Sequence, residues 1–108
     1  MKNLTPFVDA LRNRLNDYKQ RVNLTYFREY DVQVETGRRY HKIFRVEVPH
    51  DASKLVAPSI VAFVDIESGA IYKPASFKAP AKHVRGFVDS PEHGMEAVGP
   101  SGFVHYMR

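Results

Sequence analysis

The sequence predicts one α+β domain, with an N-terminal helix followed by a strongly bent antiparallel sheet or small open barrel of about five strands. Apolar residues recur at helical spacing over residues 5–22, and they then alternate with polar residues in the pattern of strands. Short turns join most of the alternating segments, which favours hairpins. The length of 108 residues suits a single domain spanning 1–108, with β-structure within 24–107. The barrel would be Sm-like or SH3-like, and a flatter sheet with the helix across one face is the alternative.

The predicted helix has a recognisable start and one continuous apolar face. Thr5 is the expected N-cap, and Pro6 suits the first helical position. This face should pack on the sheet. Because its spacing also resembles a heptad, a seam between the subunits of a homo-oligomer is a second interpretation. The residues of the face are Leu4, Val8, Leu11, Leu15, Tyr18 and Val22.

Five later segments have the pattern of strands. The first two alternate strictly and flank a turn that contains Gly37, so they form a hairpin. The third is apolar on both faces, which is typical of a central strand. A tight turn at Gly69 leads from it into the fourth. The expected strands are residues 24–35, 40–48, 59–66, 70–73 and 103–107.

Residues 74–86 fit neither pattern clearly. Pro80 could open a single helical turn over residues 81–85, and Gly86 would end it. The free N–H groups at the start of such a turn favour an anion. The turn would gather three cations at that point: Lys78, Lys82 and Arg85.

The net charge of +4 is concentrated in one acid-free segment, residues 68–88. That segment holds four of the 16 Lys and Arg residues, which leaves 12 against 12 acids elsewhere. A localised basic patch attracts anions more strongly than scattered charge does. The expected phosphate-binding residues are Lys73, Lys78, Lys82, Arg85, Arg38 and Arg39, and the expected base-stacking residues are Phe77, Tyr72 and Tyr40.

Other function classes find little support in the sequence. Cys is absent, which excludes disulfides, thiolate metal sites and Cys nucleophiles. The five His residues form no paired-His metal motif, and the glycines match neither a phosphate-binding loop nor a dinucleotide fingerprint. No segment has the apolar length of a membrane span or the pattern of a signal peptide. We therefore expect a cytosolic protein without enzymatic activity, metal or cofactor.

Residues 37–43, 61–65 and 71–86 carry a family resemblance, and the string from Lys73 to Gly86 (KPASFKAPAKHVRG) is its most specific part. These stretches resemble a family of small hypothetical proteins of tailed bacteriophages. The resemblance implies a viral product that acts in the host bacterial cytoplasm and has an Sm-like barrel. It implies no catalytic residues.

Charge, aromatic content and resemblance together predict a non-enzymatic phage accessory protein that binds single-stranded DNA or RNA through residues 73–85. One alternative is a counter-defence protein that captures a small phosphorylated nucleotide signal in a pocket lined by the same cations. Another is a structural protein or inhibitor whose basic segment faces an acidic protein partner.

Overall fold

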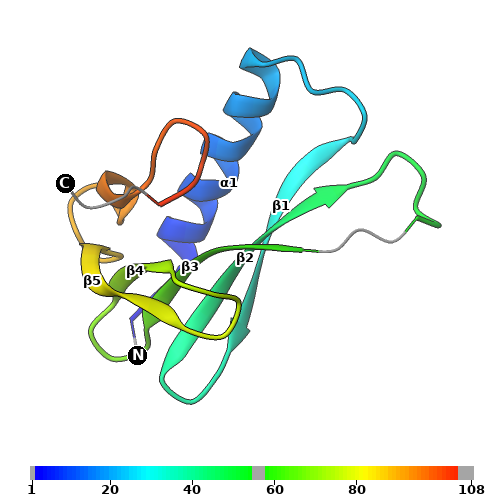
Figure 1. Cartoon of the computed structure of the whole chain (residues 1–108). Coiled ribbons are helices and arrows are strands. Elements are labelled where there is room, and N and C mark those ends of the chain that lie inside the picture. Colours follow the sequence, from blue (N-terminus) through cyan, green and yellow to red (C-terminus); the bar gives the residue numbers. More distant parts are fainter. Residues whose placement is uncertain (1, 55–57, 105–108) are drawn as a thin grey trace.

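The computed structural model describes residues 2–54 and 58–104 and contains an α-helix, a five-stranded antiparallel sheet and a short 3₁₀ helix (Figure 1). The sheet order is β1-β2-β3-β4-β5, so every strand pairs with its neighbours in sequence. This confirms the α+β class. The sheet stays open with β1 and β5 at its edges, so the expected Sm-like or SH3-like barrel does not form. The elements are α1 (Thr5–Arg21), β1 (Glu29–Thr36), β2 (Tyr40–Val48), β3 (Ser59–Asp65), β4 (Ala70–Pro74), β5 (Pro80–Phe87) and η1 (Met95–Ala97).

The start of α1 differs by one residue from the expected position. Leu4 is the N-cap, and Thr5 is already in the helix. The Asn3 side chain takes the capping role, because its Oδ1 accepts the N–H of Thr5 at 3.0 Å. Among the described residues, no helix is long and apolar enough to cross a membrane.

The hydrophobic core lies between α1 and one face of the sheet. Phe7, Leu11 and Leu15 of α1 are completely buried there. Leu11 and Leu15 belong to the expected apolar face. That face should also have included Val22, which is 46% exposed, whereas the buried Phe7 was not expected. The sheet contributes core residues from β1 to β4, among them Val32, Ile43, Val61, Ala62, Val64 and Ile71.

A β-bulge places two consecutive apolar residues of β3 on the core face. Ile43 of β2 pairs with Ala62, but the next residue, Phe44, pairs with Ile60, so Val61 is an extra residue on β3. Val61 and Ala62 are therefore consecutive and both belong to the core. The bulge accounts for the consecutive core residues Val61 and Ala62, whereas Phe63 is buried on the opposite face of the sheet.

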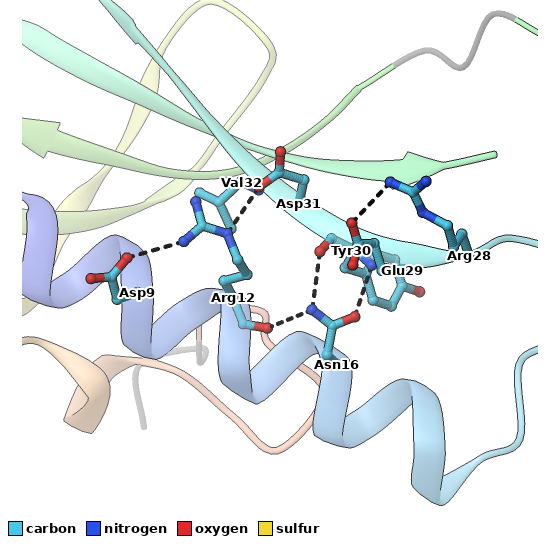
Figure 2. A network of polar contacts seen from close by, with 8 residues as sticks. All are labelled: Asp9, Arg12, Asn16, Arg28, Glu29, Tyr30, Asp31 and Val32. Carbon is cyan, nitrogen blue, oxygen red and sulfur yellow. Dashed lines mark hydrogen bonds and ion pairs between the residues drawn. The ribbon is translucent and has the colours of Figure 1, made fainter. Parts of the chain in front are cut away.

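Polar contacts attach α1 to the edge strand β1 (Figure 2). The Asn16 side chain accepts the N–H of Tyr30 at 2.8 Å and donates to the carbonyl oxygen of Tyr30 at 3.0 Å. Arg12 Nε donates to the carboxylate of Asp31 at 2.9 Å. Burial alone would raise the pKa of Asp31, but the hydrogen bonds from Arg12 and from the N–H of Val32 outweigh it, so this pKa is lowered.

One strand begins later than the sequence predicts, and another expected strand does not form in the described residues. The first strand begins at Glu29 rather than at residue 24, because Asn23 has φ of 57° and the N–H of Leu24 bonds back to the helix at the carbonyl of Lys19. The expected strand at 103–107 is wrong in its described part: Val104 makes only an isolated bridge to Val98. Residues 105–107 lie outside the described residues.

The expected helical turn at 81–85 is also wrong, and β5 takes its place. The N–H groups of Ala75 and Ser76 both bond to the carbonyl of Ala79, which closes a hairpin between β4 and β5. Pairing with β4 outweighs the local preference for a turn after Pro80. Consequently the cations of this segment do not gather at a helix N-terminus.

Residues 88–104 return across α1 (Figure 1). Arg14 Nη1 donates to the carbonyl of Val98 at 2.9 Å, and the Arg45 guanidinium lies over the ring of Phe103 at 4.7 Å. Gly102 has φ of +85°, and a Cβ there would lie 2.3 Å from Leu15 Cδ2. Only glycine fits this close approach to the helix.

Candidate nucleic-acid interface

The sheet face opposite α1 carries a row of aromatic side chains. Phe63 lies between Lys42 and Tyr72 across the three central strands. Directly opposed residues of antiparallel strands share a face, so these three are on one side. Val64 and Ile71 alternate with them and belong to the core under α1. We call this surface the aromatic face, and it consists of Tyr40, Lys42, Phe44, Phe63, Tyr72 and Phe77.

The aromatic face has buried rings at its base and accessible rings above them. Phe63 and Phe44 are 1% and 5% exposed. Tyr40 packs edge-on against Phe63 and Tyr72, with ring centroids 5.9 and 6.0 Å away, and Phe77 lies 5.5 Å from Phe44. Tyr40 and Tyr72 are half-buried, while Phe77 is 56% exposed. The structure thus brings the three expected stacking residues onto one surface.

Lys42 is the cation nearest the middle of the aromatic face. Its Nζ lies 5.9 Å from the ring centroid of Phe63 and 5.5 Å from that of Phe77, within the range of a cation–π contact. The side chain is half-buried, so its stem covers Phe63 while its charge remains near the surface.

Arg38 and Arg39 lie at the turn where the aromatic face ends. The Arg39 guanidinium stands over the Tyr40 ring at 5.2 Å, and its Nε is 3.7 Å from the carboxylate of Asp65. Both arginines line an open pocket of about 400 Å³, together with Asp65, Ile66 and Glu67. The N–H groups of Ser68 and Glu67 donate to Asp65 and lower its pKa. The acidic side chains Asp65 and Glu67 therefore share this pocket with the two arginines.

The hairpin between β4 and β5 holds Phe77 over the sheet and exposes Lys78. The Ser76 hydroxyl accepts the N–H of Lys78 at 3.2 Å, which fixes the tip of the hairpin. Lys78 is exposed and follows Phe77 directly in sequence. A ring and a positive charge thus lie together at the end of the aromatic face.

The other cations of residues 73–85 lie elsewhere. Lys73 alternates with Tyr72 and donates to the carbonyl of Val104 at 3.3 Å, on the side of the returning tail. Lys82 is exposed on the edge strand β5. Arg85 is half-buried, and its Nε and Nη1 atoms are buried with no hydrogen-bond partner in the part of the chain that the structure describes. Of the four expected cations in this segment, Lys78 is the one beside an exposed ring of the aromatic face, because Lys73 follows Tyr72 in sequence but lies on the opposite side of the sheet.

Sequence reasoning missed three members of the aromatic face: Lys42, Phe44 and Phe63. The signal for two of them was present, because Lys42 and Phe44 alternate with Tyr40 along the same strand. Within residues 2–54 and 58–104, no group of three His, Asp or Glu side chains is placed to hold a metal ion.

A protein-family model described as "Family of unknown function (DUF7717)" matches residues 2–107, which is nearly the whole chain. No curated protein and no solved structure matches the chain significantly.

Proposed function

The chain belongs to the DUF7717 family, whose function is unknown, and we propose that it binds single-stranded nucleic acid on the aromatic face without catalysing a reaction. The observation that carries the proposal is the coincidence of accessible rings and cations on the sheet face that the helix leaves uncovered. Tyr40, Tyr72 and Phe77 would stack on bases, and Lys42, Lys78 and Arg39 would meet phosphates.

The geometry supports this use in two respects. Antiparallel sheets that bind single strands place aromatic side chains on an uncovered face, where unstacked bases lie flat on them. The buried Phe44 and Phe63 support the accessible rings from below, so Tyr40 and Phe77 do not have to be ordered on binding. Ordered side chains lose less entropy when a ligand arrives.

Charge suggests where on this face the strand would lie. Glu35 of β1 stands opposite Lys42 in the ladder and is exposed, so the β1 side repels phosphate. Lys78 and the edge residue Lys82 make the β4–β5 side positive. The proposed path therefore crosses the sheet from Tyr40 towards Phe77, with Arg38 flanking its start, and Lys73 and Arg85 lie outside it.

The setting forms part of the proposal. The bacteriophage resemblance of residues 71–86 supports a viral accessory protein that acts in the cytoplasm of an infected bacterium. Capture of a small phosphorylated nucleotide is less favoured, because the pocket at Arg38 and Arg39 also contains two acids.

The test is a fluorescence-anisotropy titration with single-stranded DNA and RNA of about 5 to 20 nucleotides, at about 50 and 200 mM salt. Affinity should rise with oligonucleotide length and fall steeply with salt. Phe77→Ala should weaken binding about 5- to 150-fold, which corresponds to the loss of one stacked base. Lys78→Ala should lower the salt dependence by roughly 0.7 in the logarithmic slope.

Two matched controls separate the site from general effects. Tyr26 is also an exposed aromatic residue, at 68%, but it lies before β1, so Tyr26→Ala should leave the affinity unchanged. Lys54→Ala removes an exposed charge between β2 and β3, outside the aromatic face, and should also leave the affinity unchanged. Equal losses in Phe77→Ala and Tyr26→Ala would contradict the site. Tight, length-independent binding of a mononucleotide would favour nucleotide capture instead.

A further inference from the structure

The two edge strands of the sheet carry opposite charge. β1 contains Glu29, Asp31 and Glu35 and no cation. β5 contains Lys82, His83 and Arg85 and no acid. Four strand spacings separate the edges, which is roughly 19 Å, so the two sets cannot pair within one chain.

The edge of β1 is closed at its beginning, where side chains bond to its outward backbone groups, and open at its end, where the described residues provide no such partner. Asn16 bonds to both the N–H and the carbonyl of Tyr30, as a neighbouring strand would (Figure 2). The Asp31 carboxylate accepts the N–H of Val32 at 2.8 Å. In the described chain, no side chain bonds to the backbone of residues 33–36, and Val34 is 39% exposed. This half of the edge presents backbone groups and an apolar side chain to solvent.

The edge of β5 is closed at the end of the strand, where a side chain bonds to its backbone. Glu96 of η1 accepts the N–H of Phe87 at 3.2 Å, and its carboxylate would lie 2.8 Å from a Cβ at Gly86. The tail therefore shields the end of β5. Lys82, His83 and Val84 remain exposed, and no strand of the described chain lies beyond them.

We propose that two copies of the chain associate head to tail, with the open β1 edge of one copy pairing with the open β5 edge of the next. The sheet would then continue from molecule to molecule. Glu29 and Asp31 are ion-paired with Arg28 and Arg12, so Glu35 is the charged residue of the open half of β1. Pairing of two such halves would bring Glu35 of each copy close together, and pairing of two β5 edges would place cations against cations. The charge pattern thus favours unlike edges, which makes the contact heterologous and able to build rings or open chains.

The inference is independent of nucleic-acid binding, and its test contains no nucleic acid. Sedimentation velocity of the full chain over a range of concentrations, at low and high salt, should show reversible association that salt weakens. Glu35→Lys and Lys82→Glu should each weaken association about tenfold, because a favourable cross-strand pair becomes a repulsive one. The double variant Glu35→Lys with Lys82→Glu restores unlike edges and should recover association.

The controls use exposed charges that lie away from both edges. Asp17→Lys on α1 and Lys54→Glu should leave association unchanged, and circular dichroism checks that each variant is folded. A chain that stays monomeric at every concentration overturns the proposal, as does a double variant that fails to recover. A monomeric chain that binds an extended Lys-rich peptide, with the binding lost in Glu35→Lys, would also overturn it and identify a different occupant of β1.

Discussion

Replacement of Asn16 by Ala tests whether one side chain fixes the helix to the sheet. The change removes the acceptor for the N–H of Tyr30 and the donor to its carbonyl. Both groups are partly buried under α1, and an unsatisfied group of this kind costs about 1–3 kcal/mol. Ala is a better helix former than Asn by roughly 0.5 kcal/mol. With two such groups unsatisfied and the gain in helix propensity subtracted, we expect the free energy of unfolding to fall by about 1.5–5.5 kcal/mol in urea titrations.

Asn13 provides the matched control. It lies on the same helix, is exposed and makes no side-chain hydrogen bond among the described residues. Asn13→Ala should therefore show only the gain in helix propensity, with slightly higher stability. Asn16→Asp keeps the acceptor but places an oxygen against the Tyr30 carbonyl, so it should be no more stable than Asn16→Ala. If Asn16→Ala matched Asn13→Ala in stability, the bridging role of Asn16 would be refuted.

Three other substitutions test features of the fold. Burial lowers the pKa of His41 below its ordinary 6.5. As the pH drops from 7.5 to 5.5, His41 therefore takes up its proton more readily in the unfolded chain, and the free energy of unfolding should fall. His41→Gln should make this fall smaller in urea titrations, and an unchanged pH dependence would contradict the role of His41. Gly102→Ala should cost about 2–4 kcal/mol in thermal unfolding, because it combines left-handed strain with a clash against Leu15. Phe63→Ala should lower the free energy of unfolding by about 3–5 kcal/mol, because Phe63 is buried although it lies on the sheet face away from α1. A loss below about 1 kcal/mol would show that the buried rings of the aromatic face are not tightly packed.

Most of the fold could be predicted from the sequence, because the apolar residues of its helix and of most of its strands recur at regular spacing. Helical spacing predicted the ends of α1 to within one residue, and alternation predicted both ends of β2 correctly. The fifth strand was missed because β5 has Pro80, Lys82 and Gly86 and no clean alternation. Only pairing with β4 makes that segment a strand, and a pairing partner is not visible in local sequence.

The candidate site was predictable in its residue types more than in its arrangement. Charge counting led to residues 68–88, but it could not show that Lys73 lies on the opposite side of the sheet from Tyr72. Strand alternation determines that side, and it applies only once the strand is known. Lys42 was overlooked because it lies outside the acid-free segment, although the β2–β3 ladder places it opposite Phe63.

The order of the strands has a consequence for how the chain folds. Each strand pairs with the strand that precedes it, so the sheet forms by closing short loops, which costs little chain entropy and favours rapid folding. The contact between Arg14 and the carbonyl of Val98 spans 84 residues and requires most of the chain to be present. During synthesis, the hairpins are expected to form first, and α1 should obtain its last partners only when residues 98–102 have emerged.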